Sequence, residues 1–507
     1  MSLNQSMNIS LGSMKNNQYA LTVVSQNIAN LHVEGYHRQR VNFATNQYTT
    51  NCENVLATIR GMNGASITSL SDYIDNGAFK NMLNSNANAN YYNTLADALG
   101  ELEGIADDLG DNGLNALLND FYAAAANLEQ FPTDMSIRQQ FVLAAQNVCE
   151  KFNDISNKCD SIQQDKFHSV GTDIELMNNI LSNIADTNVA FAKHGASQSD
   201  INNLLQELSQ YTDVTTTTNE NGTVNVFIGG VAVVQGGEQK YTIEADFDST
   251  NTDSAVKFSL RSTDNPDYVI TDGINEAFNS GSMKGYIDFL NGSGGSKYTN
   301  VNDMKLALNK AASAFAAELN KIQTYDDGNT FAASLTTGDD GNLKLEKATS
   351  PLFTSKDGGA IDASNIQVNA EIADDPFKIA AARVDLSKYE AGEDWTKSVG
   401  NSDNATLITA SQNSKILSYN GDKNNCTLSQ FLTNNAAKAG MDIANIQGKA
   451  DTAQSIADTD ATNYTNLIGV NLDEELSDMI KYQRAYEASA KLFSTINDLL
   501  GTIISMV

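Results

Sequence analysis

The last 36 residues carry the pattern that most constrains how this chain can fold. Apolar side chains recur there at alternating spacings of four and three residues, the spacing of a coiled-coil seam. A second apolar stripe runs beside the first near the end of the chain, so one partner helix cannot cover both. The first stripe comprises Leu472, Leu476, Met479, Gln483, Tyr486, Ala490, Phe493, Asn497, Leu500, Ile504 and Val507, and the second comprises Leu492, Ile496, Leu499, Ile503 and Met506.

The first 30 residues carry a matching seam with a seven-residue repeat. Met7, Met14, Leu21 and Ile28 recur every seven residues, and the stripe is widened by Leu11, Val24 and Leu31. Because one seam lies at each end of the chain, we expect the two helices to pair antiparallel and neighbouring copies to cover the remaining apolar surface. The pattern alone leaves a second interpretation open, in which both helices dock on one intramolecular core.

The segment from about 78 to 212 reads as helical, with Pro132 as a break. After it we expect a helix over 134–165 and a further helix that includes Leu176 and Phe191 and is ended by Gly195. Helical periodicity returns at 300–322 and at 427–465.

Strand patterns occupy two stretches between these helical segments. Alternating apolar residues and the Asn221-Gly222 turn signal predict antiparallel strands over 213 to about 275. Residues 325–400 are rich in turns, with weak strand signals at 343–345 and 366–368. Trp395 is expected to anchor the core of a small domain there rather than to bind a ligand.

The charge balance excludes several classes of function. The chain has 32 basic and 62 acidic residues, a formal net charge of −30. Nucleic-acid binding and binding to anionic membrane surfaces both require clustered Lys and Arg, which are missing.

No apolar run reaches the ~18 residues that span a bilayer, and the N-terminus does not read as a cleaved signal peptide. The four cysteines form no CxxC pair, and we expect free thiols.

No catalytic, cofactor-binding or metal site is expected. His32 and His37 flank Glu34, but the HExxH spacing of a zinc site is missing, so a role in a loop or an interface is favoured. The acidic pair Glu474-Glu475 is expected to cap a helix or face solvent rather than to perform acid–base chemistry.

Two terminal motifs resemble a known family. QNIAN at 26–30, followed by GYHR at 35–38, resembles the N-terminal signature of bacterial flagellar axial proteins. GVNLDEE at 469–475 and YQRAYEASA at 482–490 resemble the flagellar hook-associated protein 1 family, which joins hook to filament. Interior stretches also fit, including FPTD at 131–134 with Arg138, and DP at 375–376 before IAAA at 379–382. The motif residues are Asn27, Asn30, Gly35, Tyr36, Arg38 and Asn471.

The resemblance implies a structural role and a set of partners. The subunit would leave the cell through the flagellar type III export channel, its C-terminal helix covered in the cytoplasm by an export chaperone. It would form a ring of about eleven copies between the hook protein and a second hook-associated junction protein. The family usually has a short residue or Thr where His37 stands. Another axial protein of the hook or rod, an added adhesin role for 213–400, and a grafted surface hydrolase are the competing interpretations.

Together these observations predict a mainly α fold with β-rich outer insertions (α+β). The terminal helices would pair as an antiparallel coiled coil around which copies polymerise. The expected units are a terminal domain (1–31 plus 471–507), a helical bundle (32–212 plus 284–324 and 401–470), a strand-rich insertion (213–283) and a small variable outer domain (325–400). The expected subunit interface is formed by Met7, Leu11, Met14, Leu21, Ile28, Leu472, Leu476, Met479, Tyr486, Phe493, Ile496, Leu500, Ile503 and Ile504.

Overall fold

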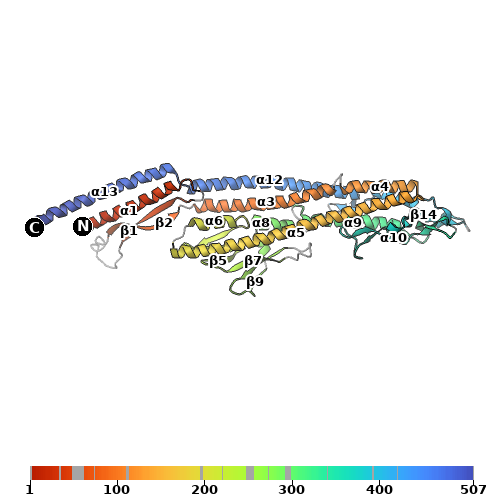
Figure 1. The fold of residues 1–507 in the computed structure, drawn as a ribbon, viewed down its shortest axis with the longest axis horizontal. Helices are drawn as coiled ribbons and strands as arrows, with labels where there is room; N and C mark the ends of the chain where they lie inside the picture. Colours follow the sequence, from red (N-terminus) through yellow and green to blue (C-terminus); the bar gives the residue numbers. More distant parts are fainter. Residues whose placement is uncertain are drawn as a thin grey trace.

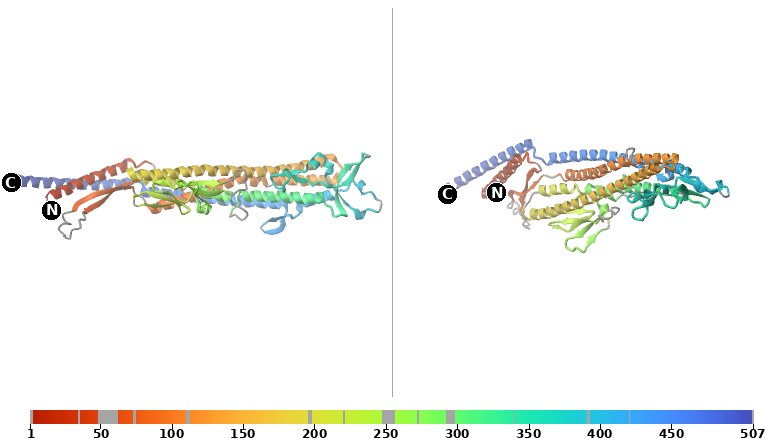
Figure 2. Two further views of the ribbon diagram at one scale, coloured as in Figure 1. Left: turned by 90° about the horizontal axis from the view of Figure 1, so that it is seen from below. Right: turned by 45° about the vertical axis from the view of Figure 1, so that its right-hand side comes forward.

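The computed structural model is an elongated molecule with both chain ends at the same extremity (Figure 1). It describes residues 3–33, 36–47, 62–72, 75–109, 113–194, 198–219, 221–246, 256–271, 273–291, 298–339, 341–390, 393–419 and 421–505. The described part is mainly helical with small antiparallel sheets, which confirms the predicted fold class. Long helices run along the molecular axis, and the β-rich segments branch from them (Figures 1 and 2).

Five helices build the middle of the molecule. Their packing buries one large apolar core, in which Phe121, Phe141, Phe152, Phe315 and Phe353 form a chain of ring contacts. Such aromatic pairs add about 0.5–1.5 kcal/mol each beyond the burial of their area. The helices are α3 (Asn76–Leu109), α4 (Leu114–Gln130), α5 (Met135–His194), α9 (Val301–Gln323) and α12 (Leu428–Ile468).

The expected division of residues 134–191 into two helices is wrong. Helix α5 runs unbroken for 60 residues, which corresponds to about 90 Å. Phe167, Val170 and Ile174 are buried and carry the apolar face across the supposed gap, so tertiary packing outweighs the local cost of Gly171. Gly195, the expected breaker, lies outside the described residues.

The predicted antiparallel strands at 213–275 are confirmed. They form a four-stranded sheet in the order β3-β4-β5-β6 and a three-stranded sheet in the order β7-β8-β9, both lying beside α5 (Figure 1). The strands are β3 (Thr215–Thr218), β4 (Val224–Ile228), β5 (Val231–Gln235), β6 (Glu238–Gln239), β7 (Tyr241–Asp246), β8 (Lys257–Ser262) and β9 (Val269–Ile270). Three helices flank them: α6 (Gln198–Leu208), α7 (Ile274–Ala277) and α8 (Gly281–Leu290).

The outer end of the molecule contains more strand than the sequence predicted. The signals at 343–345 and 366–368 are confirmed as β11 (Leu343–Lys347) and β13 (Ile366–Val368). Three further strands were not predicted: β10 (Thr330–Thr337) pairs with β11, β12 (Phe353–Ser355) pairs with β13, and β14 (Ala382–Asp385) pairs with the other edge of β10. Trp395 packs edge-on against Phe331 at 5.1 Å between ring centroids, as expected of a core anchor. The remaining elements are α10 (Ala370–Asp374), α11 (Asp403–Ala410), β15 (Leu417–Tyr419), β16 (Asp422–Cys426) and four short 3-10 turns at 376–378, 386–388, 395–397 and 411–413.

Buried Arg138 joins this outer region to the bundle. Its Nε donates to the Pro132 carbonyl (2.7 Å), and its Nη1 donates to the carbonyls of Pro376 (3.1 Å) and Ile379 (2.8 Å). Burial lowers the pKa of the guanidinium to about 10, although Asp375 opposes the shift. The interior motifs FPTD with Arg138 and DP before IAAA therefore meet at a single structural joint.

The described cysteines carry free thiols, as expected. Cys149 and Cys159 are buried on α5, and burial raises the pKa of each thiol to about 12. Cys426 is also buried, whereas Cys52 lies outside the described residues. Thiols held protonated in this way are packing groups and not nucleophiles.

Candidate assembly interface

The two chain ends form a separate rod beyond the bundle, here called the terminal rod. It consists of α1 (Leu3–Ala29), α13 (Leu472–Ser505) and a hairpin of β1 (Gln39–Gln47) with β2 (Met62–Asp72) (Figure 1). Ser13 Oγ lies 2.9 Å from Ser489 Oγ, and Asn27 Nδ2 donates to Glu475 Oε2 at 3.0 Å. Because the residue numbers run in opposite directions, α1 and α13 pair antiparallel, as predicted.

The rod buries few of its side chains. On α1 the buried positions are Ser10, Ala20, Val23, Val24 and Asn27, and on α13 they are Glu475 and Ile496 among the described residues. Tyr482 of α13 packs against Ala20 and Val23. Other apolar side chains, Leu472 and Leu476 among them, remain exposed on the flanks of the pair.

The structure sorts the predicted interface residues by exposure. Ile496 is buried, and the half-buried positions are Met7, Met14, Leu21, Ile28, Met479, Tyr486, Phe493 and Leu500. The exposed positions are Leu11, Leu472, Leu476, Ile503 and Ile504, with exposed fractions between 40% and 75%. Ile480, Leu492 and Leu499, which were not in the predicted interface, are about half exposed as well. An isolated molecule thus leaves much of its terminal apolar surface in water.

Asn27 of the N-terminal motif is the hub that ties α1 to α13 and to β1. Its Nδ2 donates to the Gln39 carbonyl (2.9 Å) and to Glu475, while its Oδ1 accepts from the Gln39 N–H (3.0 Å) and the Tyr36 hydroxyl (2.9 Å). The side chain is 1% exposed. Both donors and both acceptor sites of this buried amide are used, so no polar atom of the side chain is left without a partner away from water.

Arg38 contacts three carboxylates at the start of α13. Nε lies 2.5 Å from Glu475, Nη1 lies 2.5 Å from Glu474, and Nη2 lies 3.5 Å from Asp478. Burial lowers the pKa of the guanidinium, but the two glutamates outweigh it and leave the pKa raised. The N-terminal and C-terminal family motifs therefore meet as an ion cluster, although they lie more than 400 residues apart in sequence.

The other predicted motif residues end or begin helices. Asn471 caps α13, since its Oδ1 accepts from the N–H groups of Asp473 (2.9 Å) and Glu474 (3.4 Å). Asn30 follows α1 and donates its Nδ2 to the Gln26 carbonyl at 3.0 Å. Gly35 lies outside the described residues.

Sequence reasoning missed the elbow where the rod meets the bundle, defined here as residues 36–38 and 469–471. A cavity of about 370 Å³ lies there, bounded in part by Tyr36, Met82 and Ile468. His37 is buried beside it and packs edge-on against Tyr464 at 6.1 Å between ring centroids. The aromatic partner on α12 accounts for a large residue at 37, and no spacing in the sequence pointed to it.

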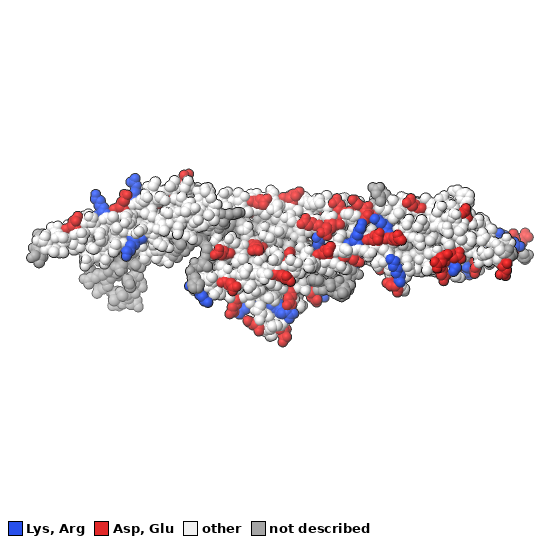
Figure 3. Space-filling model, viewed as in Figure 1, with Lys and Arg blue, Asp and Glu red and all other residues white. Residues whose placement is uncertain are grey.

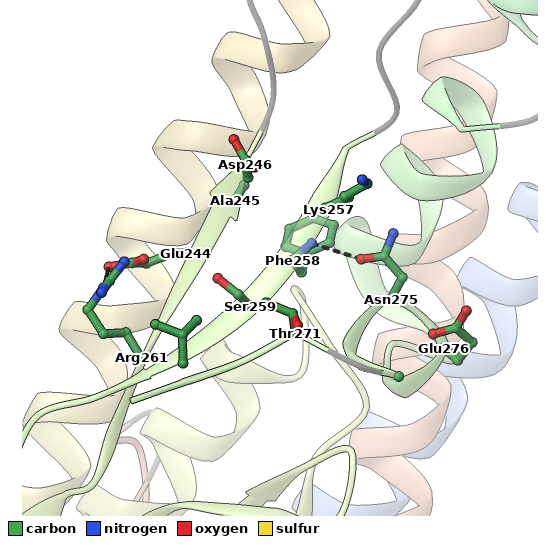
Figure 4. A pocket seen from close by; sticks show the side chains of 12 residues that line it. Glu244, Ala245, Asp246, Lys257, Phe258, Ser259, Arg261, Thr271, Asn275 and Glu276 are labelled. Atoms are coloured by element: carbon green, nitrogen blue, oxygen red, sulfur yellow. Dashed lines mark hydrogen bonds and ion pairs between the residues drawn. The ribbon is translucent and has the colours of Figure 1, made fainter. Parts of the chain in front are cut away.

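A second cavity lies in the strand-rich insertion and is accounted for by the fold (Figure 4). Arg261 Nε pairs with Glu244 at 2.6 Å, and Asn275 Oδ1 accepts from the Phe258 N–H at 2.8 Å. These two bonds link β7 to β8 and β8 to α7.

Two kinds of feature are absent from the described part of the chain. No His, Cys, Asp or Glu residues there gather in a group of three able to hold a metal ion. None of the helices there combines the length and the hydropathy needed to cross a bilayer.

The net charge is divided unequally between the terminal rod and the rest of the chain. Residues 1–72 and 471–507 contain seven basic and nine acidic side chains, a net charge of −2. The remaining residues contain 25 basic and 53 acidic side chains, a net charge of −28. In Figure 3 the acidic side chains accordingly crowd the middle and outer parts of the visible face.

Comparisons with known proteins agree with this architecture. The model of the flagellar hook-associated protein FlgK helical domain matches residues 99–331, and the model of the flagellar basal body rod FlgEFG protein C-terminal region matches residues 462–506. Flagellar hook-associated protein 1 of Bacillus subtilis is 24% identical over 96% of this chain and 95% of its own length. The Salmonella typhimurium protein of the same name is 21% identical over 99% of both chains.

A solved structure shares the fold. The flagellar hook junction protein FlgK from Burkholderia pseudomallei matches with a TM-score of 0.56 at 10% identity, covering 76% of this chain and 99% of that chain. The helical-domain match, the two relatives aligned nearly end to end and the terminal motifs all point the same way. Residues 99–331 thus match the helical domain of flagellar hook-associated protein FlgK, and the chain is similar to flagellar hook-associated protein 1 nearly end to end.

Proposed function

We propose that this chain is the structural subunit of the junction between flagellar hook and filament, and that its terminal rod is the surface through which copies polymerise. The observation that carries the proposal is the combination of exposed apolar flanks and a net charge of only −2 on the rod. Exposed contiguous apolar surface is a feature of assembly sites. The near-neutral rod allows copies to pack closely, while the acidic bulk of each copy stays apart.

The finer aspects of the proposal follow the resemblance described above. Copies form a ring of about eleven, with hook protein on one side and a second hook-associated protein on the other. The subunit is exported through the flagellar type III channel and works in the extracellular flagellum. A cytoplasmic chaperone covers α13 before export, because its exposed apolar residues need protection from water. The role is structural and non-enzymatic.

The domain assignment is part of the same proposal. Residues 1–31 with 471–507 polymerise, and the bundle of 32–212, 284–324 and 401–470 forms the wall of the ring. The segments 213–283 and 325–400 are outer insertions. Burial of the large apolar side chains in the bundle and their exposure in the rod support this division.

A pair of neighbouring substitutions tests the polymerisation surface. Leu476→Glu places a charge on the exposed flank, and Ser477→Glu places the same charge one residue away, on the outer face of α13. Both changes should leave the melting temperature of the monomer within about 2 °C of the original, because both sites are exposed. Only Leu476→Glu should prevent the protein from sedimenting with flagella and restoring motility to cells that lack it.

Imaging provides the direct check on location. Labelled protein should appear as one band at the boundary of hook and filament. Labelling along the hook, along the rod of the flagellar basal body or along the filament would replace the junction assignment with another axial role. Normal junctions built by Leu476→Glu would remove the polymerisation surface from the proposal.

A further inference from the structure

The terminal rod and the bundle have separate apolar cores. In the rod, Ala20, Val23 and Val41 form a small cluster with Tyr482 packed against it, and none of these residues belongs to the large core of the bundle. Among the described elements, α1, β1, β2 and α13 pack along one another, and none of them packs lengthwise along α3, α6 or α12. Two units joined by so narrow a contact change their relative angle unless groups at the joint restrain it.

The segment 36–38, which leads into β1, contacts both sides of this joint. Its side chains alternate in direction, as side chains do along a strand. Tyr36 and Arg38 bond to side chains of α1 and α13, so both hold the rod. His37, between them, points the other way, and its ring meets Tyr464 of α12 edge-on. His37 is therefore the side chain of this segment that holds the bundle.

The contact of His37 leads into the core of the bundle. The His37 side chain is 4% exposed and lines the elbow cavity of about 370 Å³ together with Met82 of α3 and Tyr464 of α12. The Tyr464 ring packs in turn against Phe79 of α3, with 5.2 Å between the ring centroids. Phe79 and Tyr464 both belong to the large core. A series of three rings thus runs from the elbow to α3.

We infer that the His37 side chain sets the angle between the terminal rod and the bundle. The Arg38 N–H donates to the Ile468 carbonyl at the end of α12 (3.0 Å), which places the pivot of the joint next to His37. The ring against Tyr464 opposes rotation about that pivot, while the cavity beside it offers space into which the segment turns once the ring is removed. His37 is a positioning residue in this sense. The inference concerns a single molecule and goes beyond the proposed function.

Distances between two spin labels test the inference in the full chain. Ala44→Cys on β1 and Lys193→Cys near the end of α5 are both exposed sites, one on the rod and one on the bundle, on the side of the molecule where β1 and α5 both lie (Figure 1). Cys52→Ser in the background leaves three native thiols, all of them buried. The label on β1 lies about 20 Å along the strand from Arg38, so each 10° of swing moves it by roughly 3–4 Å.

Pulsed electron paramagnetic resonance should show a single distance peak for the labelled chain. His37→Ala removes the ring and should shift or widen that peak by roughly 3–4 Å or more, the displacement of a 10° swing. His32→Ala is the matched control, because this second histidine lines the same cavity but is exposed, and the peak should stay unchanged. A peak that is equally unchanged in His37→Ala would overturn the inference.

A substitution on α12 tests the same inference in the opposite direction. Ala461 lines the cavity, and Ala461→Leu should narrow the distance peak because its added carbons occupy the space into which the segment would turn. Circular dichroism checks that each variant keeps its helix content. If His37→Ala loses helix, Ala461→Leu decides: a narrower peak supports the inference, and an unchanged or wider peak overturns it. Both measurements use the isolated chain, so a failure to assemble bears on the proposed function alone.

Discussion

The bundle and the terminal rod are both built from long helices, but the bundle buries many more of its apolar side chains than the rod does. In the bundle, α9 alone buries Leu308, Phe315 and Leu319 against its neighbours. In the rod, the 34 residues of α13 bury only Glu475 and Ile496. A helix gains most of its stability from packing an apolar face and little from its own propensity. The core of the bundle is therefore complete in one molecule, whereas the proposed function leaves the rod to be completed by neighbouring copies.

The largest expected effect comes from removing α13. Deletion of residues 471–507 should abolish assembly and motility, while the bundle melts within about 3 °C of the intact protein, because its core lies elsewhere. Circular dichroism and a motility assay measure the two outcomes. Motile cells carrying the truncated chain would contradict the contrast between the two regions.

A core truncation should damage the bundle severely. Phe315 is 1% exposed and contacts three other aromatic rings, so Phe315→Ala should cost about 3–5 kcal/mol of unfolding free energy. Leu306→Ala on the same helix is the control, since the exposed Leu306 should cost less than about 0.5 kcal/mol. Chemical denaturation measures both, and equal losses at the two sites would show that α9 is not a core helix.

The ion cluster around Arg38 should stabilise the terminal rod without stabilising the bundle. Arg38→Ala leaves Glu475 buried without its cation, and breaking such a pair costs about 3–5 kcal/mol locally. Amide hydrogens in the first turns of α13 should then exchange faster with solvent, while those of α5 keep their protection. Arg40→Ala, at an exposed site two residues away, should leave both helices unchanged. Faster exchange throughout the bundle would mean that rod and bundle unfold together.

The smallest expected effect depends on pH and lies within the bundle. Burial raises the pKa of Asp173, although the Ser282 and Tyr286 hydroxyls lower it in part. The folded carboxyl thus keeps its proton to a higher pH than the unfolded one, so stability falls as pH rises above the ordinary value of about 4.

Asp173→Asn removes that ionisation. It should raise the melting temperature by about 1–2 °C at pH 7, and the gain should disappear below pH 4. Asp165→Asn, at an exposed position on the same helix, should show no such difference between the two pH values. A gain that persists in acid would assign the effect to packing or hydrogen bonding.

The sequence predicted the elements that rest on long, regular patterns. The terminal helices and the strands at 213–275 follow from periodicity, and the antiparallel pairing follows from the presence of one seam at each end of the chain. The unbroken α5 did not, because Phe167 and Val170 sit in a polar stretch whose burial only the folded bundle provides. The β1–β2 hairpin was missed because its Asn- and Thr-rich strands do not alternate clearly in hydropathy.

The predicted interface residues stay a prediction, and the structure adds how α1 and α13 face each other. A four-and-three spacing identifies which residues are apolar on one side of a helix, and it assumes that this side faces the partner helix. Here Ser13 and Ser489 meet between the helices, and Met479 and Tyr486 of the predicted seam are half-buried, whereas Leu472 and Leu476 of the same seam are exposed. Similarly, the meeting of Asn27 with Glu475 could not be read from either motif alone, because it depends on how two distant helices are aligned.

The saturated amide of Asn27 has an evolutionary consequence. Aspartate at this position would lose both donors and set a second negative charge beside Glu475, and glutamine would be one methylene too long for the same four bonds. Its partners come from the turn after α1, from β1 and from α13. The two bonds to β1 use the backbone of Gln39 and place no demand on its side chain, whereas Tyr36 and Glu475 bond through their side chains. Changes at Asn27, Tyr36 and Glu475 are therefore coupled, and these three positions should be inherited together.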